Sequence, residues 1–203
     1  GWKTLGGNRR EASTRRSVGI PVVPYMASKI RAERAIESSG LGYTLLRLPA
    51  VLGRGDTYLS PTIIWALQSG AFFTCGTGLN KVSLMVAANL GPLIHRILTA
   101  GPTHGAFNCC DAHVPWRTLV AEYAEVLGVA VPDGKRSLLG LITHLADKRY
   151  LLLSTFSRFG AHFPDDLLGS SFPAQHAISW QRGVAEAVSG YLQGSQNPHA
   201  VPE

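Results

Sequence analysis

A continuous apolar run, YTLLRLPAVLG over residues 43–53, constrains the fold more than any other part of the sequence. Its side chains do not alternate between apolar and polar, and proline and glycine close it. This pattern is typical of a strand buried on both faces, as in parallel sheets. Residues 25–39, just before it, carry apolar side chains at helical spacing and end at the turn GLG. A helix, a short turn and a buried strand form half of a βαβ unit, so the sequence predicts an α/β fold.

The rest of the chain continues this alternation of helices and strands. Short apolar runs predict strands, and apolar residues at helical spacing predict helices, most clearly where a proline start and a glycine stop frame them. The expected strands are 72–75, 82–86 and 105–111, and the further expected helices are 61–69, 89–98, 115–128, 138–153 and 180–192.

Composition excludes several classes of protein. Of the 203 residues, 45% are hydrophobic and 16% are charged, which indicates a globular, soluble protein. No apolar run reaches the roughly 18 residues of a membrane span, and no secretory signal is visible. We therefore expect a cytoplasmic protein without a membrane partner. The three cysteines, Cys75, Cys109 and Cys110, are too few and badly spaced for a disulfide framework or a zinc site, and we expect Cys109 and Cys110 to be small, reduced core residues.

The net charge of +6 is unevenly distributed. Arg9, Arg10, Arg15 and Arg16 crowd into the first twenty residues, while the remainder is close to balanced. Such a charge suits an anionic partner. However, no interleaved aromatic residues or nucleic-acid motif accompany the arginines, which weighs against nucleic-acid binding.

Tyr25 and Lys29 stand four positions apart at the start of the first expected helix, so they share one face. An ammonium near a phenol favours the phenolate and lowers the phenol's pKa, and such a tyrosine can exchange a proton with a substrate oxygen. From spacing alone the commoner alternative is structural, with the tyrosine ring packed on the core and the lysine in solvent.

The surrounding sequence resembles the extended short-chain dehydrogenase/reductase family. The stretch YMASKIRAERAIESSGLGYTLLRLPAVLGRGD, residues 25–56, matches the family's Y-x-x-x-K motif and the following segments in order and spacing. Residues 76–90 and 105–128 resemble its later segments. The resemblance covers residues 20–130 well and the remainder loosely. The chain resembles only the C-terminal part of such enzymes. The types it resembles are NAD-dependent epimerases/dehydratases, 3β-hydroxysteroid dehydrogenases and thioester-reductase-like enzymes.

The resemblance implies an NAD(P)-dependent oxidoreductase. Tyr25 would be the catalytic general acid/base, and Lys29 would lower its pKa and hydrogen-bond the nicotinamide ribose of NAD or NADP. Leu48 and Pro49 would line the nicotinamide pocket, beyond the carboxyl end of a parallel strand, where ligands bind in such sheets. Asn89 matches a position that is commonly Asp or Asn, and a structural role is expected for it.

The implied fold is the C-terminal half of a Rossmann-type doubly wound parallel sheet, with a small, mostly helical region. The expected division is a basic loop (1–20), the half-domain carrying Y-x-x-x-K (21–130) and a substrate-binding helical region (131–203). The family's glycine-rich loop G-x-x-G-x-x-G is not found, since neither GGNRR (6–10) nor GTGLN (76–80) lies between a strand and a helix. We therefore expect association with a complementary N-terminal half or self-association. Ser13 and Thr14 are weak candidates for the family's catalytic Ser/Thr.

The substrate class is less constrained. Ala50 stands where nucleotide-sugar members often carry Asn, which argues mildly against a sugar nucleotide. An apolar C-terminal set suits a lipophilic small molecule or an acyl thioester, or else plain helix packing: Leu138, Leu139, Leu141, Ile142 and Phe156. His144, His162 and His176 lack metal-ligand spacing, and no metal is expected. The alternative to an oxidoreductase is a truncated pseudoenzyme or partner-binding module with the same fold.

Overall fold

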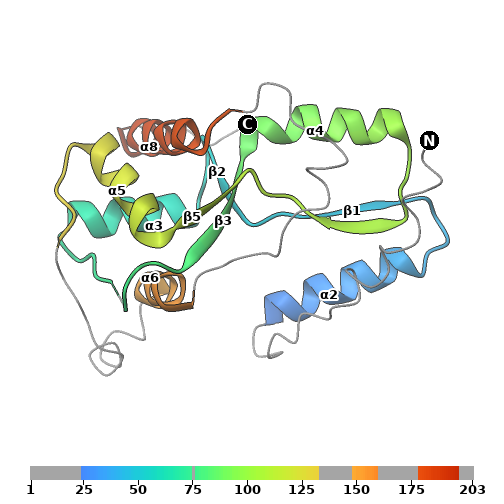
Figure 1. Cartoon of the computed structure of the whole chain (residues 1–203), viewed down its shortest axis with the longest axis horizontal. Coiled ribbons are helices and arrows are strands. Elements are labelled where there is room, and N and C mark those ends of the chain that lie inside the picture. The colour runs from blue at the N-terminus through green and yellow to red at the C-terminus, as the bar shows by residue number, and fades with distance from the viewer. Residues whose placement is uncertain (1–23, 75, 133–147, 160–177, 197–203) are drawn as a thin grey trace.

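The structure, a computed structural model, describes residues 24–74, 76–132, 148–159 and 178–196 (Figure 1). Its elements in chain order are α2 (Pro24–Glu37), β1 (Thr44–Arg47), β2 (Ala50–Leu52), α3 (Leu59–Gln68), β3 (Lys81–Val86), α4 (Ala87–Ala100), β4 (Gly105–Asn108), β5 (Ala112–Pro115), α5 (Trp116–Leu127), α6 (Lys148–Phe159) and α8 (Trp180–Gln196). The expected loop over 1–20 and the first part of the helix expected over 138–153 lie outside the described residues, as do Cys75, His144, His162 and His176.

The apolar run 43–53 forms two strands rather than the single strand expected. β1 and β2 are separated by Leu48 and Pro49 and belong to different sheets. Proline has no N–H to donate to a neighbouring strand, so a strand rarely continues through it. β1 is half-buried along its length, so the expectation of burial on both faces is wrong there.

The strands form two small sheets. In the first, β1 pairs in parallel with β4, and Arg47 lies opposite Asn108. In the second, β3 lies between β2, which is parallel to it, and β5, which is antiparallel. The stretch expected as one strand over 105–111 therefore ends early, and the chain turns to form β5. Thr74 forms an isolated bridge only, so the described part of the strand expected over 72–75 is not formed.

The main core lies between the second sheet and helices α3, α5, α6 and α8. Trp116 and Tyr123 of α5 are fully buried in it. Phe156 of α6 stacks on Trp116, with 5.7 Å between ring centroids. Phe156 is partly buried and packs against this core, which agrees with the helix-packing alternative without testing a lipophilic substrate surface. Leu138, Leu139, Leu141 and Ile142 lie outside the described residues.

A second, smaller core supports the first sheet. Figure 1 shows β1 and β4 lying between α2 and α4. Leu93 and Ile97 of α4 pack with Phe107 of β4 and with Cys109, which is 1% exposed. Cys109 is therefore the small core residue expected from the sequence, whereas Cys110 is partly exposed.

Among the residues that the structure describes, no helix is long and apolar enough to cross a bilayer. Within the same residues, no three His, Cys, Asp or Glu side chains are grouped so that they could hold a metal ion.

Asp56 of the GRGD segment lies three residues before α3 and binds its first turn. Its carboxylate accepts hydrogen bonds from the backbone N–H of Tyr58 and of Ser60, both at 2.8 Å. The Ser60 hydroxyl also contacts the carboxylate and lies 2.6 Å from the phenol oxygen of Tyr123. Burial raises the pKa of Tyr123, so this phenol stays protonated at neutral pH. Asp56 therefore links the start of α3 to α5 in the main core.

Replacing Asp56 should destabilise the fold measurably. Asp56→Ala leaves backbone N–H groups of the first turn without their acceptor, and we expect a loss of about 1–2 kcal/mol in the free energy of unfolding. Asp56→Asn keeps an oxygen acceptor and should lose less. Urea denaturation of the two variants and the wild type measures both effects. Equal stabilities of the Ala and Asn variants would show that the carboxylate is not a helix cap.

Candidate active site

Helix α2 carries the Tyr25–Lys29 pair expected from the sequence. The backbone places Tyr25 in the first turn, directly after Pro24, a residue well suited to the first helical position. The Tyr25 side chain lies outside the described atoms. Lys29, one turn later, is exposed. The helical backbone therefore puts both residues on one face, as the four-residue spacing predicts.

A bidentate ion pair attaches α2 to β1. The Arg47 guanidinium donates to both carboxylate oxygens of Glu33, from Nε at 2.9 Å and from Nη2 at 2.6 Å. The hydrogen bond to Glu33 is the main cause that raises the pKa of Arg47, while partial burial opposes it. Paired planar groups of this kind restrict orientation as well as distance. The pair therefore joins the middle of α2 to the carboxyl end of β1.

This attachment brings Lys29 level with the link between β1 and β2. Lys29 precedes Glu33 by four residues, or about 6 Å along a helix. Pro49 follows Arg47 by two residues, or about 7 Å along an extended chain. α2 and β1 run in opposite directions (Figure 1), so both displacements point the same way. Lys29 and the Leu48–Pro49 link thus lie at the same end of β1, its carboxyl end.

Leu48 and Pro49 are accessible at this edge. Leu48 is 41% exposed and Pro49 is half-buried. β4 ends beside them, because the backbone N–H of Cys109 donates to the Arg47 carbonyl at 2.9 Å. The carboxyl ends of two parallel strands therefore meet here, which is the usual position of a ligand site in open α/β sheets.

Sequence reasoning missed Cys110 and His113 at this edge. Cys110 was expected to be a core residue, but it lies two residues past the end of β4 and is partly exposed. Its Sγ is 3.5 Å from Nε2 of His113 on β5. The spacing Cys-x-x-His was visible in the sequence, but it indicates contact only once β5 is known to begin at Ala112.

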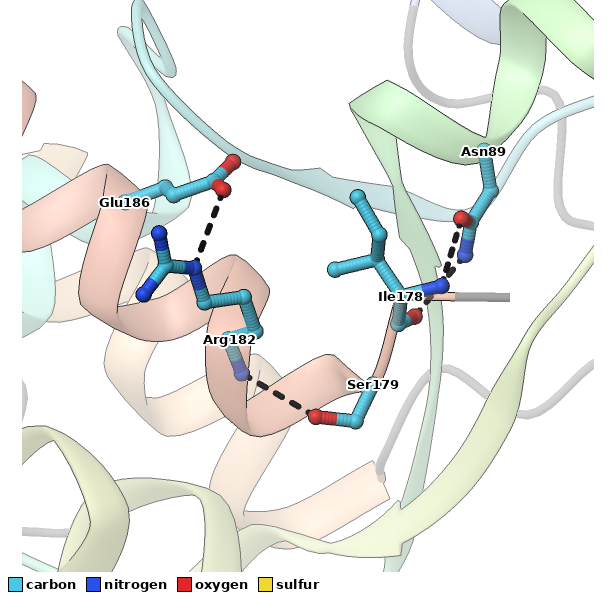
Figure 2. A network of polar contacts seen from close by, with 5 residues as sticks. All are labelled: Asn89, Ile178, Ser179, Arg182 and Glu186. Carbon is cyan, nitrogen blue, oxygen red and sulfur yellow. Dashed lines mark hydrogen bonds and ion pairs between the residues drawn. The ribbon is translucent and has the colours of Figure 1, made fainter. Parts of the chain in front are cut away.

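Asn89, for which a structural role is expected, connects segments that lie far apart in the sequence. Figure 2 shows its amide facing the backbone of Ile178, just before α8. Oδ1 accepts from the Ile178 N–H and Nδ2 donates to the Ile178 carbonyl, both at 2.9 Å. Nδ2 also donates to Asp111, whose carboxylate accepts from the Val86 N–H at 2.7 Å. These contacts fix the start of α4 to the segment that leads into α8.

The helix that follows is held at its own start. The Ser179 hydroxyl accepts from the backbone N–H of Arg182 at 3.3 Å, and Arg182 pairs with Glu186 one turn further on (Figure 2). A serine at this position is a typical N-terminal cap. Asn89 and Ser179 together therefore hold the start of α8 near the second sheet.

A cleft opens at the ends of β2 and β3. It has a volume of about 260 Å³ and is formed by residues 51, 53–57 and 87. Ligand sites for drug-sized molecules usually measure roughly 300–1,000 Å³, so this cleft would hold a small group or one end of a larger molecule. Its exposed cation, Arg54, is hydrogen-bonded to Gln193 of α8.

Comparison with known proteins rests on structure. No family model matches the chain. No curated protein matches its sequence either. Among similar solved structures is WbmH of Bordetella bronchiseptica in complex with NAD+, with 19% identity and a TM-score of 0.63 over 83% of this chain and 51% of that one. Another is dTDP-glucose 4,6-dehydratase of Bacillus anthracis in complex with NAD, with 16% identity and a TM-score of 0.63 over 88% and 55%.

A third similar structure is UDP-N-acetylglucosamine 4-epimerase of Methanobrevibacter ruminantium with UDP-N-acetylmuramic acid, with 18% identity and a TM-score of 0.58 over 86% and 55%. The chain thus spans about half the length of these proteins. At such identities the likeness shows the fold alone. The mixed α/β fold of Rossmann type expected from the sequence is therefore confirmed, while the roles of Tyr25, Lys29, Leu48 and Pro49 stay predictions.

Proposed function

We propose that this chain carries the acid/base pair and the substrate side of an NAD(P)-dependent oxidoreductase of the epimerase/dehydratase type. The observation that carries the proposal is the Glu33–Arg47 attachment, which aligns Lys29 with the exposed Leu48–Pro49 link at the carboxyl end of β1. Solved structures of the same fold that contain NAD or NADPH support it.

The residues present fit the nicotinamide end of a dinucleotide. Leu48 and Pro49 offer an apolar surface for a flat ring, and an exposed ammonium at Lys29 suits a ribose hydroxyl. A bound nicotinamide would supply hydride transfer. The chain's own part is proton transfer: Tyr25 takes the proton of a substrate hydroxyl during oxidation and returns it during reduction. Lys29 holds positive charge near the phenol and so favours its phenolate form.

The substrate is a small molecule, and three classes remain to be separated. Several similar structures contain sugar nucleotides, such as UDP-glucose or UDP-glucuronic acid. Ala50 argues mildly against that class, because it offers no side-chain amide near the site. Phe156 is only partly buried against the main core, so its position does not decide between helix packing and a lipophilic site. Lipophilic alcohols and acyl thioesters therefore stay as alternatives without a described binding surface of their own.

The function is tested with the whole product of the gene, including any residues encoded before Gly1. Reduction of NAD+ or NADP+ is followed with nucleotide sugars and hydroxysteroids, and oxidation of NADH or NADPH with acyl thioesters. Epimerase and dehydratase products are analysed separately, because those reactions return the hydride and leave no net change in the cofactor. Turnover in any arm supports the proposal. If the protein binds the cofactor but shows no turnover in any arm, the oxidoreductase assignment is contradicted.

A second candidate is a non-catalytic, partner-binding module of the same fold. The observation that favours it is the sequence itself, which contains no G-x-x-G-x-x-G loop in these 203 residues. Exposed apolar residues on α4, Ile94 at 43% and Leu98 at 75%, suit contact with another protein surface. If the whole gene product binds neither NAD(H) nor NADP(H), this second function is favoured instead.

Replacing Lys29 should affect both binding and turnover. Lys29→Met removes the proposed ribose contact, and hydrogen bonds to a charged group contribute about 1.5–3 kcal/mol, so we expect cofactor affinity to fall about 10- to 100-fold. Turnover should fall as well, because the phenolate of Tyr25 loses its neighbouring charge.

Arg31→Met is the matched control, since it removes one cation from an exposed position of the same helix. Calorimetric titration and initial rates on the whole gene product measure both quantities. An unchanged cofactor affinity in Lys29→Met would exclude the ribose contact, and equal losses in both variants would indicate general charge rather than a specific site.

A further inference from the structure

Cys110 occupies an unusual position for a cysteine. It follows the core residue Cys109, whose backbone N–H is bonded to the Arg47 carbonyl, and so it lies at the same sheet edge as Leu48 and Pro49. Cys109 is buried and Cys110 is partly exposed. Two adjacent thiols of the same chain therefore have different access to reagents in solvent.

The Cys110 thiol has an imidazole as its neighbour. Sγ of Cys110 lies 3.5 Å from Nε2 of His113, and Nδ1 of His113 lies 2.8 Å from the hydroxyl of Ser83. Ser83 on β3 is fully buried and is the direct antiparallel partner of His113 on β5. The strand register therefore places Ser83 against Nδ1 of the imidazole, while Nε2 faces the Cys110 sulfur.

This order of groups is that of an activated nucleophile. Thiolate, not thiol, is the nucleophile, and a neighbouring histidine that takes the proton increases its population. The third group, here the Ser83 hydroxyl, orients the base. Cys110, His113 and Ser83 therefore combine a nucleophile, a base and an orienting partner, with the nucleophile at an accessible edge.

We propose that Cys110 is a covalent modification site, a thiol activated by His113 that undergoes exchange with low-molecular-weight disulfides. His113 takes the thiol proton, the Cys110 sulfur attacks one sulfur of the small disulfide, and the S–S bond breaks. The leaving thiolate receives the proton from His113. One disulfide is consumed and one mixed disulfide is formed, so no further oxidant is needed.

A group attached at Cys110 would stand beside Leu48 and Pro49. If that edge is the nicotinamide end of the site, the mixed disulfide blocks it and turnover falls. This consequence rests on the proposed function, whereas the reactivity of the thiol does not. Reaction of Cys110 with a small disulfide would therefore inhibit turnover under oxidising conditions.

The reactivity is tested by alkylation and by thiolation. The intact protein is treated at neutral pH with iodoacetamide, and in parallel with oxidised glutathione, and mass spectrometry of peptides follows each cysteine. A free cysteine is only a few per cent thiolate at neutral pH, so complete ionisation can raise its alkylation rate by a few tens of times at most. The gain is smaller in practice, because a thiolate of lower pKa is a weaker nucleophile. We expect Cys110 to react about tenfold faster than in a synthetic peptide of residues 105–115.

Variants identify the base. His113→Gln should return the rate of Cys110 to that of the peptide, and Ser83→Ala should lower it several-fold. Cys109 reports on folding in the same molecules, because it stays slow while the second core is intact. If a variant exposes Cys109, it is not folded correctly. The proposal is then judged only by the reaction rate of Cys110 in the wild-type protein relative to that in the peptide. A wild-type rate no faster than the peptide, or an unchanged rate in a folded His113→Gln protein, would overturn the proposal.

The two proposals fail in distinguishable ways. If Cys110 is thiolated quickly but the modified protein keeps its turnover, the thiol is reactive as proposed. In that case Cys110 does not lie beside the substrate site. If thiolation is slow in a protein that turns over substrate, the oxidoreductase function is supported and the proposal of a reactive thiol is contradicted.

Discussion

Tyr25→Phe is expected to lower kcat of the whole gene product by about 10²- to 10⁴-fold, the usual contribution of one general acid/base group. The variant removes one hydroxyl and keeps the aromatic ring. Each factor of ten corresponds to about 1.4 kcal/mol of activation free energy, so the loss amounts to about 2.7–5.4 kcal/mol. Because the substrate is bound in both states, KM should change much less than kcat.

The experiment separates catalysis from folding and from general surface effects. Tyr58→Phe is the matched control, because Tyr58 is 68% exposed and the change deletes the same hydroxyl. Its kcat should equal that of the wild type, and both variants should unfold at the wild-type urea concentration. If Tyr25→Phe keeps more than about a tenth of the wild-type kcat, proton transfer by Tyr25 is not part of the reaction.

The elements that local signals specify were predicted well. α5 begins after Pro115 and ends at Gly128, which adopts φ +68° as a left-handed C-terminal glycine should. β3 and α4 also lie where the apolar runs placed them. In each case the signal lies within a few residues of the element, so no distant contact was needed to find it.

The break in the apolar run has a local signal of its own in the sequence. Pro49 stands inside 43–53, and a proline argues against an uninterrupted strand that pairs on both sides. Leu46 of β1 packs against the smaller core, whereas β2 contributes Leu52 to the main core and packs Val51 against the smaller one. Continuous hydrophobicity therefore does not distinguish one long buried strand from two short strands of separate sheets.

The neighbourhood of the candidate site depends on contacts that no local pattern shows. Sequence indicated Tyr25 and Lys29 by their spacing and their family resemblance. It could not show that Glu33 meets Arg47, or that Ser83 lies opposite His113, thirty residues away. The first contact joins α2 to β1, and the second requires the antiparallel register of β3 and β5. Cys110 gains its chemical interest only from that register.

The 203-residue chain by itself is expected to bind NAD(H) and NADP(H) with a dissociation constant far above the micromolar range. Enzymes of the Rossmann type hold the dinucleotide largely through its pyrophosphate, which lies on a glycine-rich loop and a helix N-terminus. These residues contain no such loop sequence. Lys29 and the Leu48–Pro49 link would contact the nicotinamide end only.

The expected loss is large enough to decide the question. Each charge-assisted hydrogen bond to the pyrophosphate contributes about 1.5–3 kcal/mol, and three such bonds would together change the dissociation constant by roughly three to six powers of ten. Calorimetric titration of the 203-residue chain at micromolar cofactor should therefore show no heat of binding. A cooperative urea transition of the same sample establishes that the chain tested is folded.

The same titration with the whole gene product gives the comparison. If residues encoded before Gly1 supply the pyrophosphate site, that protein should bind at micromolar cofactor while the 203-residue chain does not. A micromolar dissociation constant for the 203-residue chain would mean that a cradle exists among these residues. Its anchor would then have to be sought at another cationic segment, and the arginines of residues 9–16 would be the first to replace. The proposal that this chain supplies only the nicotinamide and substrate side would in that case be wrong.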